Sequence, residues 1–213
     1  MSLTTGLLRA YNFEGNSTDL VGGYNGTDTS VSYSTSYGKI LQGVHTTGSG
    51  SYITATNTSL PLGSSSWSVC MYIKTTSSAT SSLYGYGTVS SFGFRNCMLI
   101  VSGKAYFSGF GVDLDSGFTV NDGNPHTIEV TYDGTTLKIY VDGSLKNSGT
   151  VSLNVQSGTS LYIGSEPTLG SYYVGDMDML YFWNRELTSA EALEYHNLAS
   201  QYPFNNANFM SFM

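Results

Sequence analysis

The sequence predicts an all-β protein, an antiparallel β-sandwich of the jelly-roll kind with one short C-terminal helix. Residues that favour strands are abundant, with 17 Tyr and 10 Phe in 213 residues, and 25 Gly supply turns. About a dozen short strand-like runs are separated by turn signals. Helices do not alternate with these runs, which argues against a doubly wound α/β fold.

The N-terminal half contains a first strand, a loop and a central core strand. Residues 6–14 alternate partly and predict a strand, and a loop rich in Gly, Asn and Asp follows at residues 15–28. Further strand-like runs lie at residues 31–33, 39–44 and 51–55. In residues 67–74 every second side chain is apolar, namely Trp67, Val69, Met71 and Ile73. This period of two predicts a strand with one face in the core.

Residues 126–143 predict a hairpin followed by a second turn. Asp133-Gly134 is a strong turn signal, because a type I′ turn needs positive φ at both central residues. A two-residue turn there would place Glu129 opposite Lys138, so that opposite charges meet on the outer face. Asp142-Gly143 predicts the next turn.

One helix is predicted near the C-terminus, over residues 189–200. Thr188 and Glu191 have the spacing of a capping box, in which both side chains bind N–H groups of the first turn. The apolar stripe of this helix is Ala192, Leu193, Leu198 and Ala199. Other strands are expected at residues 92–101, 105–112, 144–148, 160–164 and 172–183. We expect one domain over residues 1–213, with its core at 6–200 and an apolar tail at 201–213.

Composition excludes several classes of protein. Only 11% of residues are charged, and 15 acidic against 8 basic residues give a net charge of −7. Nucleic acid is not an expected partner, because phosphate binding needs clustered Lys and Arg. No run approaches the ~20 apolar residues of a membrane span, and Met1–Leu8 shows no signal peptide. Cys70 and Cys97 are expected to be buried thiols, with one disulfide between neighbouring strands as the alternative.

The order of the segments resembles the laminin G-like, concanavalin A-like superfamily over residues 6–200. The opening Gly6-Leu-Leu-Arg-Ala-Tyr-Asn-Phe-Glu14 is similar to its first strand, and Ser66-Trp-Ser-Val-Cys-Met-Tyr-Ile-Lys-Thr75 to its central strand. The other matching segments are residues 19–27, 126–143, 161–164 and 173–191. Residues 194–204 also resemble versions of the domain found in bacteriophage and virus structural proteins.

The resemblance implies a calcium site, because in this superfamily a cation often ties an early loop to the closing strand. Calcium prefers six to eight oxygen ligands. The corresponding carboxylates here are Glu14, Asp19, Asp176 and Asp178. The alternative is that these carboxylates accept hydrogen bonds from backbone N–H groups and hold no metal.

Four tyrosines are candidates for a ligand-binding surface. Tyr84 and Tyr86 lie in a run where glycines would leave their rings unshielded, and Tyr172 and Tyr173 lie between two glycines. Such rings could stack on sugars. The alternative is that they pack the sandwich or its edges.

The resemblance implies a non-catalytic, lectin-like recognition domain for a glycan or surface polysaccharide, located outside the cell or on a virion surface. Fold alone does not establish function. The alternative is a structural or decoration protein of a phage or virus particle, which contacts other virion proteins or forms a homo-oligomer through residues 204–213. A polysaccharide hydrolase or lyase is the least favoured reading. No Glu is followed by Asp two residues later, so the paired-carboxylate motif of related glycosidases is absent, as is a nucleophile elbow.

Overall fold

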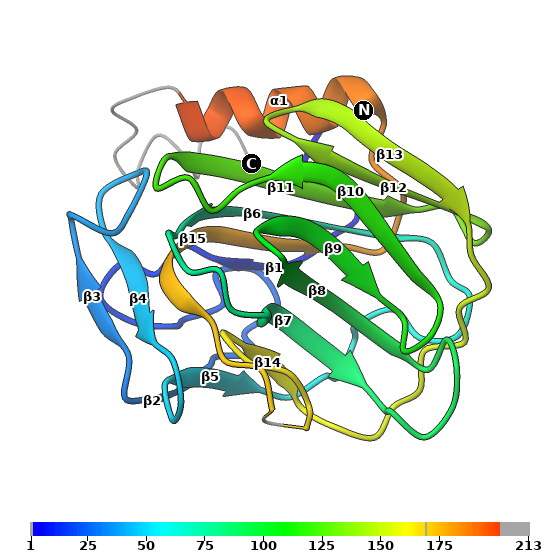
Figure 1. Cartoon of the computed structure of the whole chain (residues 1–213), viewed down its shortest axis with the longest axis horizontal. Helices are drawn as coiled ribbons and strands as arrows, with labels where there is room; N and C mark the ends of the chain where they lie inside the picture. The colour runs from blue at the N-terminus through cyan, green and yellow to red at the C-terminus, as the bar shows by residue number, and fades with distance from the viewer. Residues whose placement is uncertain (1, 169, 201–213) are drawn as a thin grey trace.

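The computed structural model describes residues 2–168 and 170–200, and they form two antiparallel sheets packed face to face (Figure 1). Sheet A has eight strands: β1 (Leu7–Tyr11), β3 (Ser32–Ser34), β4 (Gly43–Thr47), β6 (Trp67–Lys74), β11 (Pro125–Tyr132), β12 (Thr136–Val141), β13 (Ser144–Thr150) and β15 (Val174–Trp183). Sheet B has seven: β2 (Thr27–Thr29), β5 (Tyr52–Ala55), β7 (Ser81–Gly87), β8 (Arg95–Val101), β9 (Lys104–Ser108), β10 (Asp113–Thr119) and β14 (Leu161–Ile163). The predicted fold class is confirmed.

The order of strands joins distant parts of the chain. Sheet A runs β13-β12-β11-β6-β15-β4-β3, and β1 also pairs with β15. Sheet B runs β10-β9-β8-β7-β14-β5-β2. The first and last strands of the chain are therefore neighbours, and β5 lies between β14 and β2 at one side of sheet B.

The core lies between the two sheets. Trp67 of β6 contacts Phe107 of β9 across the sandwich, with ring centroids 5.7 Å apart. Ile53 of β5 and Ile163 of β14 are also fully buried in this cluster. Burial of these apolar side chains is the main force that holds the two sheets together. Their outward neighbours along β5 and β14 consequently point away from the core.

The helix α1 (Ser189–Ser200) covers part of the outer face of sheet A (Figure 1). The predicted capping box is present: Thr188 N donates to Glu191 Oε2 at 2.9 Å, and Glu191 N donates to Thr188 Oγ1 at 3.3 Å. Tyr195 is buried against the rings of Tyr181 and Trp183. The apolar stripe was predicted only in part, because Leu193 is 46% exposed.

The hairpin of β11 and β12 differs from the prediction in register but not in face. Tyr132 pairs with Leu137, so the register is shifted by two residues and Glu129 lies opposite Tyr140 rather than Lys138. The carboxylate of Asp133 accepts the N–H groups of the two residues after Gly134 and so closes a longer loop. A shift of two residues keeps every side chain on its predicted face.

The second turn agrees with its prediction. Asp142 and Gly143 have φ angles of 55° and 68°, as a two-residue hairpin turn between Val141 and Ser144 requires. Asp142 is one of the few non-glycine residues with positive φ, a conformation that Asp tolerates better than most residues.

Both cysteines are buried free thiols, as expected. Cys70 packs beneath α1 on the outer face of sheet A, whereas Cys97 lies near Gly85 on the outer face of sheet B. The two side chains are separated by the sandwich itself, so the alternative of a disulfide is excluded. Burial raises the pKa of Cys97 to about 12, and that of Cys70 is also raised by burial. In the described part of the chain, no helix is long and apolar enough to span a membrane.

Candidate functional site

A pocket of about 610 Å³ opens to solvent at the β5 side of sheet B. Its lining consists of hydroxyl and amide side chains with one alanine and one glycine: Asn25, Thr27, Thr54, Ala55, Thr56, Asn57, Ser157, Gly158, Thr159 and Ser160. None of these residues is ionisable. The volume lies in the ~300–1,000 Å³ range of ligand sites, and the lining offers both donors and acceptors of hydrogen bonds.

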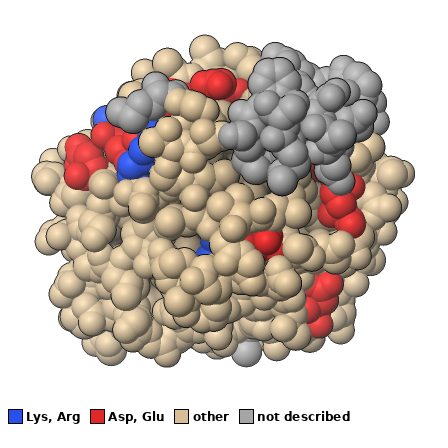
Figure 2. All heavy atoms as spheres, turned by 180° about the vertical axis from the view of Figure 1, so that it is seen from behind, with Lys and Arg blue, Asp and Glu red and all other residues tan. Residues whose placement is uncertain are grey.

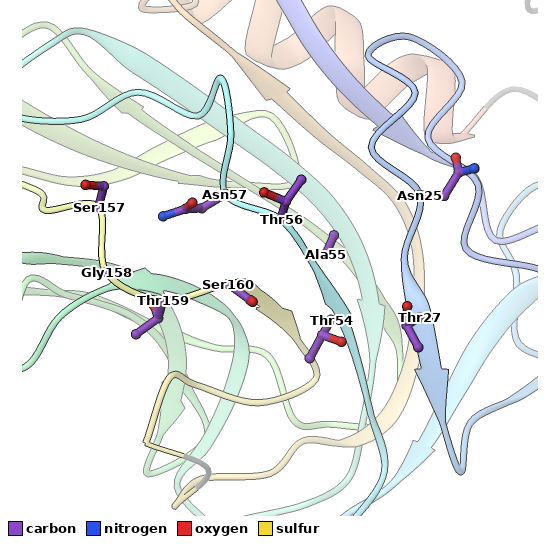
Figure 3. Close-up of a pocket in the computed structure, with 10 residues that line it drawn as sticks. All are labelled: Asn25, Thr27, Thr54, Ala55, Thr56, Asn57, Ser157, Gly158, Thr159 and Ser160. Atoms are coloured by element: carbon purple, nitrogen blue, oxygen red, sulfur yellow. The ribbon is translucent and has the colours of Figure 1, made fainter.

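Three segments form the pocket, as Figure 3 shows. They are the start of β2 with the residues before it, the end of β5 with the loop after it, and the loop that leads into β14. Thr54 of β5 lies at the centre, because it pairs with Thr27 of β2 on one side and with Tyr162 of β14 on the other. The sheet register therefore sets the positions of the pocket walls.

Three tyrosines lie beside the pocket on the same outer face, and we call them the tyrosine cluster: Tyr52, Tyr162 and Tyr172. The rings of Tyr52 and Tyr162 are 6.2 Å apart, as are those of Tyr52 and Tyr172. All three side chains are partly exposed. Tyr52 is two residues before Thr54, so both point to the same side of the sheet. The pocket and the tyrosine cluster therefore lie side by side on the outer face of sheet B.

The connection between β14 and β15 places Tyr172 in this cluster. Its first residues cross the outer face of sheet B, where Pro167 Cδ lies 3.0 Å from the position of a Cβ at Gly85. Arg95 anchors the segment through a buried ion pair with Glu166 and donates to Ser108 Oγ at 2.6 Å. Further along, Tyr172 forms a β-bridge with Ser82 of β7.

Arg9 of β1 supports the pocket from inside the molecule. Its side chain is fully buried, and Nη1 donates to the carbonyl oxygen of Thr56 at 2.7 Å. Nη2 donates to the carbonyl of Thr58, and the guanidinium lies 4.5 Å from the ring centroid of Tyr24. Arg9 therefore fixes the loop that follows β5, and Tyr24 precedes the pocket residue Asn25.

The prediction of an exposed aromatic surface is wrong for Tyr84, Tyr86 and Tyr173, each of which is 0% exposed. Tyr84 donates to Asn96 Oδ1 at 2.9 Å, and Tyr86 to the carbonyl of Pro61 at 3.1 Å. The Tyr173 hydroxyl lies 3.1 Å from the carbonyl oxygen of Lys74 and 3.2 Å from that of Asp176, between which it shares its single proton. The alternative, packing in the sandwich, describes these three rings. Of the predicted set, only Tyr172 lies at the surface.

Two of the predicted metal ligands are bound by backbone N–H groups. The carboxylate of Asp19 accepts hydrogen bonds from the backbone of Ala10, Val21 and Tyr24 at 3.0–3.1 Å. The carboxylate of Asp178 accepts from Lys39, Ile40 and Met179 at 2.9, 3.1 and 2.7 Å. Both carboxylates therefore have the backbone N–H partners that the alternative describes.

The other two carboxylates have different surroundings. Glu14 accepts the N–H of Gln42 at 3.1 Å and lies close enough to Asp178 for their charges to interact. Asp176 binds His45 Nδ1 at 2.6 Å. Within residues 2–168 and 170–200, no group of three or more His, Cys, Asp or Glu side chains is arranged to hold a metal. Calcium at these positions stays a prediction.

Burial affects the protonation of the Glu14 and Asp178 carboxyls. It raises the pKa of Asp178 to about 8, against the lowering effect of the three N–H donors, and the charge of Glu14 raises it further. The pKa of Glu14 is also raised by burial. Two neighbouring carboxyls of this kind favour the neutral form more than exposed ones do.

Two histidines contact carboxylates in three places, and none of these contacts was predicted. His45 is bound to Asp176 and stacks on Tyr37, with ring centroids 4.9 Å apart. Both ring nitrogens of His126 make hydrogen bonds to carboxylates, Nδ1 to Asp142 at 2.9 Å and Nε2 to Asp122 at 3.2 Å. Among the described hydrogen bonds, none joins a serine hydroxyl to either imidazole, so neither pair forms a serine–histidine–carboxylate site.

The molecular surface is poor in charge. Figure 2 shows one face on which Lys, Arg, Asp and Glu form a few separate patches between large uncharged areas. A ligand of such a surface is recognised by hydrogen bonds and apolar contacts rather than by charge. The predicted oligomer contact at residues 204–213 lies outside the described residues.

A sequence model of the "Concanavalin A-like lectin/glucanases superfamily" matches residues 47–192. No curated protein sequence matches the chain. Domain 4 of AbnA, a GH43 extracellular arabinanase from Geobacillus stearothermophilus solved in complex with arabinotriose, is similar in structure. Its TM-score is 0.72 at 18% identity, over 92% of this chain and 98% of that domain.

Two toxin domains share the fold as well. The binding domain of Paraclostridial Mosquitocidal Protein 1 has a TM-score of 0.74 at 12% identity, over 91% of this chain and 52% of that one. The receptor-binding domain of botulinum neurotoxin C/D mosaic serotype has a TM-score of 0.70 at 16% sequence identity. The match covers 90% of this chain and 51% of that one. The chain thus spans about half of each toxin domain. Similarity at this level establishes the fold.

Proposed function

The chain belongs to the concanavalin A-like lectin/glucanase superfamily, and from this premise we propose that it is a non-catalytic carbohydrate-binding domain. The observation that carries the proposal is the junction of the uncharged pocket with the tyrosine cluster on one face of sheet B. Thr54 belongs to the pocket and pairs directly with Tyr162 of the cluster.

The chemistry of the site suits sugars. A sugar ring presents hydroxyl groups at its edge and C–H groups on its faces. Threonine, serine and asparagine side chains donate to and accept from hydroxyls, and the pocket is lined by these types. Tyrosine offers an apolar ring face together with a polar end. The combination supports recognition of a glycan on the outer surface of the sheet.

The solved structures are consistent with a binding role. The arabinanase domain was solved with arabinotriose, and both toxin domains are described as binding or receptor-binding domains. Fold similarity does not by itself transfer a ligand. The proposal therefore depends on the residues of this chain.

A binding role fits the pocket better than hydrolysis does. Glycoside hydrolysis normally needs two carboxyl groups on either side of the scissile bond. The pocket lining has no Asp or Glu. We further propose that the domain meets its glycan outside the cell, as a domain of an extracellular arabinanase would. A structural role in a phage or virus particle depends on residues 204–213 and stays a prediction.

A glycan array tests the proposal, with Thr54→Val and Tyr162→Ala as site variants. We expect defined oligosaccharides to bind the unmodified protein and to bind each variant about tenfold more weakly, or ~1.4 kcal/mol. Tyr106→Ala is the matched control, since Tyr106 is a partly exposed tyrosine on β9, away from the pocket. Absence of glycan binding, or equal loss in the control, would contradict the proposal.

A further inference from the structure

We propose that the ligand of this site is an electrically neutral glycan chain, with one sugar unit in the pocket and the next on the tyrosine cluster. The inference rests on the proposed function and makes it more specific. It follows from the charges around the pocket and from the spacing between the pocket and the rings.

The acidic group nearest in sequence to the pocket residues is already engaged. Asp28 follows Thr27, and its carboxylate accepts the hydroxyls of Ser17 at 2.6 Å and Tyr33 at 2.7 Å. Asp28 pairs with the buried Ile53, so its side chain points to the opposite face of β2 from the pocket residue Thr27 and presents no charge to the pocket lining. The net charge of −7 disfavours the approach of an anionic ligand over longer distances.

Two arginines hold the segments around the site, and both are already engaged inside the protein. Arg9 is fully buried behind the pocket wall, and its two terminal nitrogens donate to the carbonyls of Thr56 and Thr58. Arg95 is buried and paired with Glu166. A carboxylate or sulfate in the pocket would give up water without gaining a positive partner, which is unfavourable. A neutral sugar loses only hydroxyl hydration, which the lining can replace.

The geometry extends the site beyond one sugar. Directly opposed side chains on neighbouring antiparallel strands lie about 5 Å apart, which is the relation between Thr54 and Tyr162. A unit bound at Thr54 therefore continues onto the ring of Tyr162. The rings of Tyr52 and Tyr172, each 6.2 Å from a neighbour in the cluster, prolong the surface. A chain of two or more units uses the whole face, whereas a monosaccharide uses the pocket alone.

The test is an array of neutral and acidic oligosaccharides, followed by calorimetry on every sugar that binds. The neutral set holds arabinan, xylan, glucan, galactan and chitin oligomers from one to five units. The acidic set holds oligogalacturonate, oligoalginate, heparin fragments and sialylated glycans. We expect binding only in the neutral set, with affinity unchanged between low and high salt. Affinity should rise about tenfold from one to two units, or ~1.4 kcal/mol.

The variants separate the two parts of the site. Tyr162→Ala should weaken binding of the disaccharide and leave the monosaccharide unchanged, whereas Thr54→Val should weaken both. Asn57→Lys adds a cation at the pocket and should allow an acidic sugar to bind. These changes lie at surface positions, and circular dichroism checks that each variant is folded.

Three outcomes would overturn the inference, and they differ from one another. If acidic sugars bind more tightly than neutral ones, and salt weakens that binding, the inference of a neutral ligand is overturned while the proposed carbohydrate-binding function stands. Equal affinity for one and two units would overturn the extended site. Failure of every sugar to bind would overturn the proposed function itself, and the inference with it.

Discussion

Tyr162 lies directly opposite Thr54 across the β14–β5 pair, so a partly exposed ring and a pocket hydroxyl occupy neighbouring positions on one sheet face. Neither residue is held by a flexible loop. Both positions are set by the register of short strands whose inward neighbours are buried in the core. These two positions are therefore as rigid as the sandwich at this edge, so little conformational entropy is lost when they contact a ligand.

Tyr162→Phe should separate ring stacking from hydrogen bonding by the tyrosine hydroxyl. If the ring face makes the contact, Tyr162→Phe keeps most of the affinity for an oligosaccharide, while Tyr162→Ala loses about tenfold, or ~1.4 kcal/mol. Isothermal titration calorimetry with the best oligosaccharide from the array measures the difference. Equal losses in both variants would assign the contribution to the hydroxyl instead.

Arg9→Met should both destabilise the protein and weaken glycan binding at the pocket. The substitution leaves the carbonyls of Thr56 and Thr58 without their donor, and each buried polar group left unpaired costs about 1–3 kcal/mol. We expect a lower denaturation midpoint in urea and weaker glycan binding at temperatures where the variant is folded. The control is Lys104→Met, which removes only a half-exposed ion pair with Asp115 at 3.9 Å. Its effect should stay within ~0.5 kcal/mol.

Stability should increase when the pH is lowered from 8 to 5. Burial raises the pKa of Glu129 to about 8, from a usual value of 4.5. Between these values the folded protein holds a proton that the unfolded chain releases, so a rise in pH favours unfolding. The contribution of Glu129 to the free energy of unfolding is fully present below about pH 4.5 and is lost as the pH rises through 8. Each unit by which the pKa is raised corresponds to ~1.4 kcal/mol. His126, whose pKa is raised by its hydrogen bond to Asp142, acts in the same direction.

Thermal melts of Glu129→Gln across this pH range test the assignment. The amide cannot ionise, so the variant should show a shallower dependence of Tm on pH. Glu194→Gln is the control, because Glu194 is exposed on α1, and it should reproduce the slope of the unmodified protein. An unchanged slope in Glu129→Gln would show that other groups cause the dependence.

Calcium binding at Glu14 and Asp178 can be tested by stability. A divalent cation between the two carboxylates would relieve their repulsion, so the sequence-based prediction requires a higher Tm in calcium than in EDTA. Asp178→Asn should then abolish the shift. An identical Tm in calcium and EDTA would contradict the prediction and leave the backbone N–H groups as the partners of Asp178. That variant should be less stable in either case, since its amide has only one acceptor oxygen.

The sequence predicted the sandwich, the helix with its cap and the turn at Asp142-Gly143, because these depend on local periodicity and on residues with particular backbone preferences. It failed at Tyr84 and Tyr86 for a physical reason. β7 is buried along its whole length, and a register irregularity lies between Ser82 and Tyr84. Alternation cannot identify the inner face of a strand that is covered on both sides.

The pocket and most of the tyrosine cluster were not predicted, because they depend on pairing between distant segments. Tyr52 and Tyr162 do carry a local signal, since each lies at an outward position beside buried isoleucines. Nothing in the sequence shows that β5 and β14 are neighbours. Arg9 has no visible signal either, since its hydrogen bonds to the loop after β5 go to backbone carbonyls, which every residue possesses.

The contact of Arg9 with the loop after β5 also bears on biosynthesis. Arg9 belongs to β1, and β1 is held in the sheet by β15, which leaves the ribosome last among the strands of the described residues. A nascent chain that has already produced the pocket segments still lacks the strand that anchors β1. The proposed glycan binding should therefore emerge only after β15 has been synthesised, and products truncated before β15 should not bind glycans.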